Sequence, residues 1–448
     1  MYLASVDIGT TNLKINLFTP TNELLAAVTY AHSEISQNTT LFELSVDEIY
    51  TNLTKGLLKL KKRFGLDELE IVLTTAMHSV QLLTADYAPI GGLVTWADQR
   101  GAVSLNSASL AERQAQYMRT GTPSHTMNPF YKLRDLDLSE ATFIGSLKDV
   151  IFYRLTGEWA LDRSNAAASG LLNLASLDWD WESLVRLGLA PAQLPRLVEI
   201  DYSAASQLTD LPARVTIGTS DGISSNYVFA DLSDVAVLSI GTSHAVRVIA
   251  EKPNVNPAYQ NFAYYIKEDA YLLGLPSNNG ADVLAWAQRI FNCSFEELDQ
   301  VASQRPKGRE IFLPYINGER APKWDESLLA EFFALSRTSS RESVLYAIIL
   351  GMMFNIKQNV EALAELADFS ALGVVGGVMK LPHFSQLLCD ILGYPLYIPT
   401  LENAETLGSI SVAHHQLFQN EYRVLQPNPT SDFKEHYARY LEKANRDN

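Results

Sequence analysis

One short pattern occurs twice in the chain, and it constrains the fold more than any other feature. Residues 8–11 read Ile-Gly-Thr-Thr and residues 240–243 read Ile-Gly-Thr-Ser, each followed by alternating apolar side chains. Each copy is typical of a buried strand, a tight glycine turn and a second strand. Such a recurrence indicates a duplicated domain. We therefore expect an α/β protein with two related domains, residues 1–230 and 231–448.

The chemistry of the first turn indicates what the two copies bind. Thr10, Thr11 and Asn12 follow Gly9 and offer hydroxyls, an amide and backbone N–H groups, which suit phosphate oxygens. Asp7 ends the preceding strand, where a carboxylate can hold a magnesium ion. A single Gly/Thr motif is more often an ordinary turn. Two such turns that face each other across a cleft can clamp one triphosphate.

Strand and helix patterns alternate along the rest of the chain. We expect helices over residues 45–65, 146–157, 223–230, 341–366, 382–393 and 405–418, and strands over residues 71–75, 93–96, 214–218, 235–240 and 372–375. Capping boxes are expected in the pairs Ser45 and Glu48, Ser146 and Asp149, and Ser339 and Glu342. The helix over 341–366 is apolar nearly all round, which predicts a buried helix.

Polar side chains follow two early strands at the point where each ends. Met77 and His78 follow the strand over 71–75, and Asp98 and Arg100 follow the strand over 93–96. Open α/β sheets place their ligands at the carboxyl ends of strands. A lone histidine at such an end is usually structural, and Asp98 and Arg100 can equally pair with each other.

Two later strands also end in residues suited to a ligand. Asp221 lies between the strand over 214–218 and a helix, where it is either a functional carboxylate or a plain helix N-cap. Gly376 and Gly377 follow the strand over 372–375, and paired glycines allow the backbone to approach an anionic or flat ligand closely.

Composition excludes several classes of partner. The net charge of −16 argues against nucleic acid and anionic membranes, which bind basic faces. The longest apolar run, residues 346–354, is too short to span a bilayer, and Asp7 interrupts any signal peptide. The two cysteines, Cys293 and Cys389, indicate no disulfide framework and are expected in the core. We expect a cytoplasmic protein.

Taken in order, these motifs resemble those of a known superfamily. Asp7-Ile-Gly-Thr-Thr, Ile240-Gly-Thr-Ser and Val375-Gly-Gly resemble the two phosphate motifs and the adenosine motif of the actin/hexokinase-like superfamily. The runs at residues 77–79, 95–100, 220–222 and 312–322 narrow the resemblance to the FGGY carbohydrate kinases. Together with the run over 168–180, they look most like gluconate kinases, with xylulose kinases next.

The resemblance implies a fold and a reaction. The fold is two duplicated actin-like (ribonuclease H-like) domains with mixed β-sheets, flanking helices and a cleft between them. The reaction is phosphorylation by ATP, with Mg²⁺, of a terminal hydroxyl on an open-chain sugar or sugar acid. Gluconate giving 6-phosphogluconate is the first expectation, and xylulose or another pentulose is the alternative. The partner is thus a small molecule, and a homodimer is left open.

The resemblance also assigns residues to roles. Asp221 corresponds to the catalytic base, which orients the substrate hydroxyl in a loose transition state. The substrate set is Met77, His78 and Asp221 by this resemblance, together with Asp98 and Arg100, which either bind substrate hydroxyls or pair with each other. The nucleotide set is Thr10, Thr11, Asn12, Lys14, Gly241, Thr242, Gly376 and Gly377. The metal set is Asp7 and Asp221. If the substrate is gluconate, its carboxylate needs a cationic partner, for which the candidates are Arg100 and Lys132.

Several positions depart from the family pattern. Leu329, Ala330 and Ala334 stand where the family carries Arg-Gly and a later Gly, and Leu381 stands where a polar side chain can reach adenine. His244 replaces a common glycine after the second phosphate motif. These departures motivate an alternative of another class, a degenerate kinase fold that acts as a sugar-binding or regulatory protein.

Overall fold

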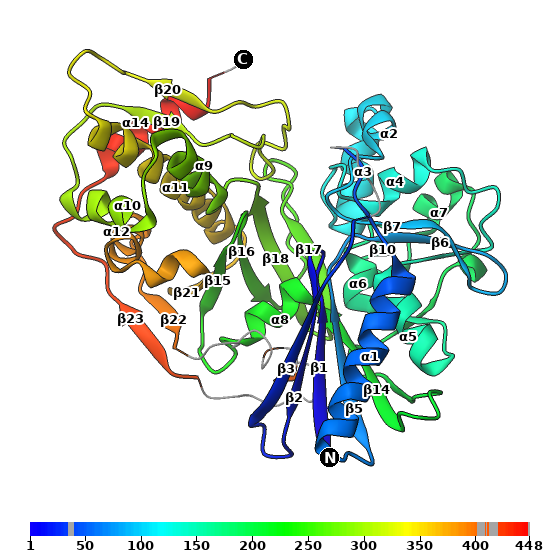
Figure 1. The fold of residues 1–448 in the computed structure, drawn as a ribbon. Helices are drawn as coiled ribbons and strands as arrows, with labels where there is room; N and C mark the ends of the chain where they lie inside the picture. Colours follow the sequence, from blue (N-terminus) through cyan, green and yellow to red (C-terminus); the bar gives the residue numbers. More distant parts are fainter. Residues whose placement is uncertain (35–39, 401–407, 409, 412–419, 447–448) are drawn as a thin grey trace.

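Two large mixed β-sheets form the centres of the two halves of the protein (Figure 1). The computed structural model describes residues 1–34, 40–400, 408, 410–411 and 420–446. The expected helix over 405–418 lies mostly outside the described residues.

The first sheet has six strands in the order β13-β14-β5-β1-β2-β3. β1 runs antiparallel to β2 and parallel to β5, which in turn runs parallel to β14. The strands are β1 (Tyr2–Ile8), β2 (Asn12–Phe18), β3 (Leu24–Ala31), β5 (Leu69–Thr75), β13 (Ser203–Ala205) and β14 (Ala213–Ser220).

The second sheet has seven strands in the order β17-β18-β16-β15-β21-β22-β23. These strands are β15 (Val235–Ile240), β16 (His244–Ala250), β17 (Phe262–Lys267), β18 (Ala270–Ser277), β21 (Ala371–Val375), β22 (Leu396–Pro399) and β23 (Tyr422–Leu425). Its core order β18-β16-β15-β21-β22 repeats the order β3-β2-β1-β5-β14 of the first sheet, with the same antiparallel and parallel pairings. The predicted duplication is thus confirmed, and residue 230 falls between Ser220 and Val235.

A third sheet belongs to an insertion in the first half, in the order β4-β7-β6-β8. It consists of β4 (Glu43–Leu44), β6 (Val80–Leu83), β7 (Pro89–Val94) and β8 (Phe143–Gly145). The two strands followed by predicted site residues thus lie in different sheets, because Met77 and His78 follow β5 of the first sheet and Asp98 and Arg100 follow β7 of the third. The short pairs β9 (Ala160–Asp162) with β12 (Arg196–Val198), β10 (Leu172–Asn173) with β11 (Asp178–Trp179), and β19 (Ile311–Leu313) with β20 (Glu331–Phe333) complete the strands.

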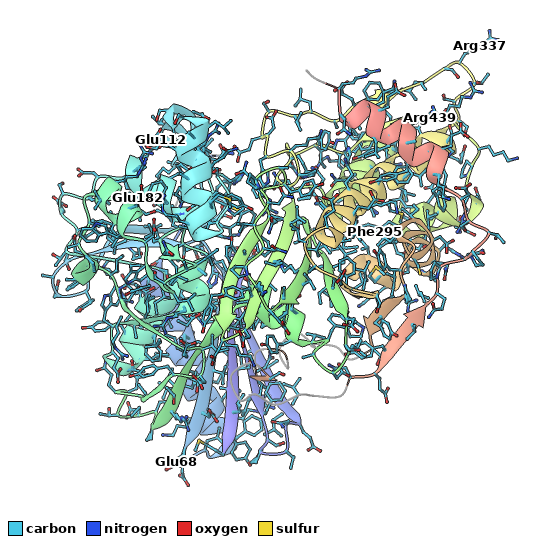
Figure 2. The ribbon with its side chains drawn as sticks, turned by 180° about the vertical axis from the view of Figure 1, so that it is seen from behind. Glu68, Glu112, Glu182, Phe295, Arg337 and Arg439 are labelled. Carbon is cyan, nitrogen blue, oxygen red and sulfur yellow. The ribbon has the colours of Figure 1, made fainter. Side chains whose placement is uncertain are left out.

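Helices cover the sheets of both halves (Figures 1 and 2). The first half has α1 (Val46–Phe64), α2 (Ala102–Ser107), α3 (Leu110–Thr120), α4 (Pro129–Asp135), α5 (Leu147–Thr156), α6 (Arg163–Ala167), α7 (Trp181–Leu187) and α8 (Asp221–Tyr227). The second half has α9 (Asp282–Phe291), α10 (Phe295–Gln304), α11 (Arg341–Ala364), α12 (Pro382–Leu392) and α14 (Lys434–Ala444). Among the described residues, none of these helices is both long and apolar enough to cross a membrane.

Local signals set most helix ends. Ser45 caps α1 by accepting from Glu48 N, and Gly65 ends it in the left-handed region. Ser146 and Asp149 form the expected capping box of α5. The capping pair expected for α11 is wrong by one residue at each position, because Ser340 and Ser343 exchange the hydrogen bonds.

The apolar cores follow the duplication. One core lies under the first sheet against α1 and α5, and a larger one surrounds the buried α11. A third cluster joins the halves, since Ala166, Ala167 and Ile223 pack with Tyr264 and Leu272 of the second sheet. The two halves are therefore joined by a shared core on one side. Cys389 is buried and Cys293 is only partly buried.

Candidate active site

A cavity of about 280 Å³ brings both halves of the chain together. Its volume lies near the lower end for ligand sites, which suits a small molecule. The lining residues are Thr10, Met77, His78, Trp96, Met127, Asp221, Ser239, Ser243, His244, Ala245, Arg247, Phe262, Pro276 and Arg320. Of the residues expected from sequence, this wall contains Thr10, Met77, His78 and Asp221.

Asp221 occupies the first turn of α8, directly after β14, and Ser220 takes the N-cap position. The plain N-cap alternative for Asp221 therefore does not apply. A β-carbon on the next residue, Gly222, would lie 2.8 Å from Met77 Cε and 3.6 Å from Arg247 Nε. This spacing places Met77 and Arg247 beside the turn that carries Asp221.

Lys148 on α5 holds the strand ends beneath this turn. Its side chain is about 1% exposed, and its Nζ donates to the carbonyls of Leu73 (2.9 Å), Ile217 (2.7 Å) and Thr219 (2.9 Å). Burial lowers the pKa of Lys148 to about 8, although the charges of Asp162, Asp221 and Asp7 act to raise it. One buried cation thus supports both carboxylates expected at the reaction centre.

The two phosphate-type turns have similar geometry. Gly9 N donates to Asn12 O at 3.0 Å, and Gly241 N donates to Ser243 O at 2.9 Å. A β-carbon on Gly9 or Gly241 would make only ordinary contacts, at 3.5 and 3.8 Å. The protein's own atoms therefore do not demand glycine at either position, and the missing side chains leave room for a ligand against the backbone.

The second turn is braced by the loop before α9. Gly241 O accepts from Ala281 N at 2.7 Å, and Thr242 O accepts from Gly280 N at 3.1 Å. A β-carbon on Gly280 would collide with the backbone of Ser243, so glycine is needed for this approach. The sequence patterns did not single out this loop.

The contacts of His244 explain why this residue departs from the family pattern. Its Nδ1 lies 3.1 Å from Asn279 O, so Nδ1 carries the proton, and its Nε2 accepts from Asn359 Nδ2 at 3.2 Å. Burial lowers the pKa of His244 to about 4, so the ring is neutral at neutral pH. The histidine therefore ties the second turn to α11.

Asp7, Lys14 and Asp221 form the charged part of the expected metal and phosphate region. Asp7 pairs in register with the exposed Lys14 on β2 and with Thr74 on β5. Within the described ranges, no cluster of three or more His, Cys, Asp or Glu side chains is arranged to hold a metal. Two carboxylates near one site still fit Mg²⁺, which usually keeps several waters and binds substrate phosphates.

His78 and Met77 lie where the sequence placed them, at the cavity wall. His78 Nδ1 lies 2.6 Å from Ala168 O, which fixes the proton on Nδ1 and leaves Nε2 as an acceptor. Tyr264 OH lies 3.4 Å from that Nε2. Burial lowers the pKa of His78 to about 3, so it stays neutral and can accept a hydrogen bond from a hydroxyl.

Asp98 and Arg100 are not among the cavity-lining residues. Arg100 Nη2 lies 2.7 Å from Asp98 Oδ2 and 2.6 Å from Glu43 Oε1, so the charges of the pair are satisfied within the protein. Lys132 is fully buried, and its Nζ donates to the carbonyls of Thr95 and Asp98. Burial lowers the pKa of Lys132 to about 7. The geometry supports the pairing alternative for Asp98 and Arg100, and it leaves a substrate carboxylate without either expected partner.

The remaining nucleotide residues lie outside the cavity wall. Thr11, Asn12, Lys14, Gly241, Thr242, Gly376 and Gly377 are all placed at or beside the two turns and the end of β21. Gly376 has φ +140°, and a β-carbon there would collide with Ile240 O, whereas Gly377 faces open space. Gly376 thus packs β21 onto the strand that leads into the second turn.

Apart from His244, the named departures in the second half are not among the cavity-lining residues. Leu329 is about 74% exposed, and Ala334 takes φ +60° in an exposed loop, a conformation that favours glycine. Leu381 is the N-cap residue of α12 and makes no side-chain cap.

Ten of the lining residues were not predicted as site residues from the sequence, and four of these are Trp96, Met127, Arg247 and Arg320. Trp96 and Arg320 lie within motifs that carried the resemblance, so the motifs pointed to the right segments but to different side chains. Arg247 follows the second turn along β16. The one sequence signal for Arg247 as a site residue is its position on the strand that follows the second turn.

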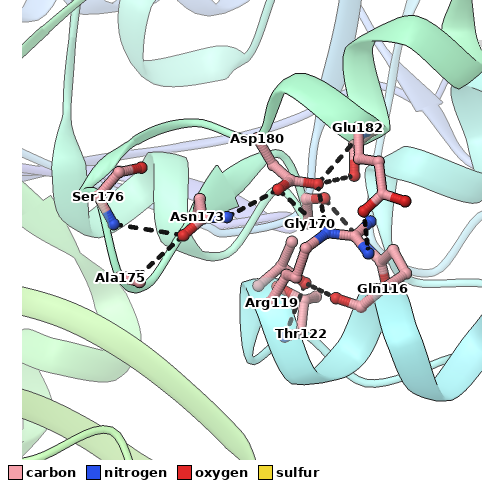
Figure 3. Close-up of polar contacts among 11 residues, drawn as sticks. Gln116, Arg119, Thr122, Gly170, Asn173, Ala175, Ser176, Asp180 and Glu182 are labelled. Carbon is pink, nitrogen blue, oxygen red and sulfur yellow. Dashed lines mark hydrogen bonds and ion pairs between the residues drawn. The ribbon is translucent and has the colours of Figure 1, made fainter.

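The run over residues 168–180 serves mainly to build the insertion (Figure 3). Asp180 caps α7 by accepting from Ser183 N at 3.1 Å, and its carboxylate also lies 3.1 Å from Arg119 Nε. Asn173 Nδ2 donates to the same carboxylate at 2.9 Å. These contacts orient α3 and α7 rather than a ligand.

Comparisons with known proteins cover nearly the whole chain. The model described as "FGGY family of carbohydrate kinases, N-terminal domain" matches residues 1–221, and the corresponding C-terminal domain model matches residues 236–417. Gluconokinase of Bacillus subtilis (strain 168) is 28% identical over 443 residues, covering 91% of this chain and 86% of that protein. Xylulose kinase of Escherichia coli (strain K12) is 24% identical, covering 88% and 86%.

Two solved structures from Lactobacillus acidophilus are similar over the same extent. A ligand-bound xylulose kinase superimposes with a TM-score of 0.90 at 28% identity, covering 98% of this chain and 96% of that one. A gluconate kinase superimposes with a TM-score of 0.88 at 28% identity, covering 98% and 95%.

Proposed function

The chain belongs to the FGGY family of carbohydrate kinases, and we propose that its substrate is a sugar acid, gluconate, which it converts to 6-phosphogluconate. The observation that carries this proposal is the cavity in which Asp221, His78 and Met77 from the first half meet Ser243 and Arg320 from the second. The gluconokinases among the relatives support the choice of gluconate. Xylulose is the second candidate, since a xylulose kinase structure superimposes as closely as the gluconate kinase structure.

Asp221 is the proposed catalytic base. Its carboxylate orients the terminal hydroxyl and accepts its proton as the phosphoryl group transfers. In a loose transition state the nucleophile needs positioning more than activation, so an ionised carboxylate at a rigid strand end is sufficient. His78 Nε2 is proposed to accept a hydrogen bond from a hydroxyl further along the sugar chain in place of Tyr264 OH, which lies 3.4 Å from it. Met77 lines the wall.

ATP is the phosphate donor that the family implies. Thr10, Thr11 and Asn12 in the first turn and Gly241 and Thr242 in the second are proposed to hold its phosphate oxygens through hydroxyls and backbone N–H groups. Lys14 adds positive charge beside the first turn, and Gly376 and Gly377 are proposed to face the nucleoside end. Mg²⁺ held by Asp7 and Asp221 would neutralise phosphate charge.

Replacement of the base tests the assignment of Asp221. We expect Asp221→Asn to lower kcat at least 1,000-fold while changing the affinity for gluconate less than threefold, because the amide keeps the shape but cannot accept the proton. A coupled ADP-release assay measures kcat, and calorimetry measures gluconate binding. Asp210→Asn, at an exposed loop position, is the matched control and should retain kcat. Full activity of Asp221→Asn would refute the role of Asp221.

The substrate is tested by the same ADP-release assay with gluconate, xylulose, ribulose and glycerol. We expect the highest kcat/KM with gluconate. A preference for xylulose would instead establish the second candidate.

A further inference from the structure

Arg320 is a buried cation whose nearest acidic neighbours are directed elsewhere. The residue is about 8% exposed, and its Nη2 donates to Ser277 O at 3.0 Å. The preceding Glu319 accepts instead from Asn355 Nδ2 at 2.7 Å and from Arg320's own backbone N at 2.8 Å. Glu326 lies 2.9 Å from His125 Nε2 and accepts from Thr126 at 2.9 Å.

The guanidinium also keeps an unused donor. Arg320 Nε is buried and has no hydrogen-bond partner within the part of the chain that the structure describes. Burial lowers the pKa of Arg320 to about 10, which is still high enough to keep it charged at neutral pH. A buried guanidinium with an unsatisfied N–H is costly unless an anion binds it.

Arg320 borders the cavity on the side of Trp96. Its guanidinium carbon lies 5.5 Å from the centre of the Trp96 ring, and both side chains line the cavity. Arg247, in contrast, lies beside Gly222 and therefore beside Asp221. A substrate whose reactive hydroxyl meets Asp221, and whose chain passes Met77 and His78, directs its other end toward Trp96 and Arg320.

We propose that Arg320 binds the carboxylate of the sugar acid at the end opposite the phosphorylated hydroxyl. This inference rests on the proposed function and names the residue that selects an acid. A guanidinium binds a carboxylate through charge-assisted N–H bonds, and the Nη donors not used by Ser277 supply them. The Trp96 ring restrains the plane of the guanidinium, so the donors are oriented before the substrate arrives.

This assignment replaces Arg100 and Lys132 as the carboxylate partner. Arg100 is neutralised by Asp98 and Glu43, and Lys132 is fully buried against backbone carbonyls. Arg320 alone of the three borders the cavity.

The test compares two ligands that differ only at the proposed contact. D-Glucitol has the carbon chain of gluconate with a CH₂OH group in place of the carboxylate. Calorimetry on the full chain should show that Arg320→Met weakens gluconate binding on the order of 10- to 100-fold, the range expected for losing a charged hydrogen-bonded pair. Its glucitol binding should change less than threefold. Arg320→Lys should retain part of the gluconate affinity, because it keeps the charge but lacks the fork.

Two controls separate recognition from folding and from net charge. Arg289→Met removes an exposed arginine of α9 and should leave both affinities unchanged. Retained glucitol binding shows that Arg320→Met is folded. If Arg320→Met does not fold, the gluconate and glucitol affinities of Arg320→Lys are compared with those of wild type instead.

The outcomes distinguish this inference from the proposed function. Equal weakening of both ligands, or unchanged gluconate binding, overturns the role of Arg320. Wild-type turnover of gluconate with an unchanged KM in Arg320→Met would leave the proposed function standing and refute the inference. Arg320-dependent binding of gluconate without turnover would support the inference and refute the proposed function. A wild-type protein that does not bind gluconate would refute both.

Discussion

Lys148 shows how one side chain can serve both the fold and the site. Its three donors are all used on backbone carbonyls at the ends of β5 and β14, close to the strands that deliver Thr75 and Asp221. Among the residues that the structure describes, no carboxylate hydrogen-bonds to Lys148 directly, so its charge is stabilised by peptide dipoles and by Asp162, Asp221 and Asp7 through space. Protonation of a buried lysine such as Lys148 lowers the free energy of unfolding, because the folded protein must then bury a charge.

The pH dependence of stability tests the burial of Lys148. Its pKa is about 8 in the folded protein and about 10.4 when unfolded, so the unfolded chain binds more protons between these values. The penalty from the buried charge is full below pH 8 and disappears as the pH rises toward the unfolded value. The free energy of unfolding of wild type minus that of Lys148→Met should therefore rise by about 2 kcal/mol from pH 7.5 to 10.

Urea denaturation of both proteins across this range measures the difference. Lys59→Met, on the exposed face of α1, is the control and should give a difference that does not vary with pH. A pH-independent difference for Lys148→Met would show that the ammonium is not buried.

At the scale of elements, the end of β14 determines where Asp221 lies. The pairing of β14 with β5 shifts register between Thr216 and Thr219, and Gly218 within this bulge has φ +66°. A β-carbon on Gly218 would collide with Leu73 O on β5. Glycine therefore permits both the backbone conformation and the close approach of the two strands.

Two glycines with nearly the same φ allow the cost of the left-handed conformation to be separated from the cost of the backbone collision. Gly65 ends α1 at φ +62° and a β-carbon there would meet nothing within 4 Å. Gly65→Ala should cost about 1 kcal/mol, the price of the left-handed conformation alone. Gly218→Ala should cost at least about 3 kcal/mol, because the backbone collision is added. Urea denaturation of the two variants compares them directly, and equal costs would show that β5 and β14 adjust without strain.

At the scale of the whole molecule, a loop of the second half that carries Trp324 and Glu326 contacts the first half beside the cavity. Glu326 bridges His125 and Thr126 of the first half, and Trp324 packs edge-on against His125 with ring centres 5.4 Å apart. His125 Nδ1 accepts from Met127 N at 3.1 Å, so its proton lies on Nε2, toward Glu326. This contact joins the halves on the Met127 side of the cavity.

Loss of this contact should open the protein. We expect Glu326→Ala to raise KM for the sugar substrate about three- to tenfold with little change in kcat, because a smaller fraction of molecules is closed before binding. Small-angle X-ray scattering without substrate should show a larger radius of gyration. Glu331→Ala, at an exposed position of β20, should change neither quantity. An unchanged KM together with an unchanged radius would show that the Glu326 contact is not needed to keep the halves closed.

The sequence by itself determined the duplicated fold, the two phosphate-type turns and the segments that border the cavity. The duplication and the turns depend on local periodicity and on turn chemistry, which act within a few residues, whereas the segments that border the cavity were indicated by the resemblance to the FGGY carbohydrate kinases. The boundaries of α1 and α12 and the position of Asp221 at a strand end followed from the same signals.

Only the tertiary structure decided which side chains of those segments face the cavity. Asp98 and Arg100 were expected there but are paired with each other and with Glu43, whereas Trp96 and Arg320 lie in the wall. The orientation of a side chain beyond a strand end depends on partners far away in the chain, such as Ser277 for Arg320. Those partners are brought together only when the insertion and the two sheets pack, so no local pattern encodes them.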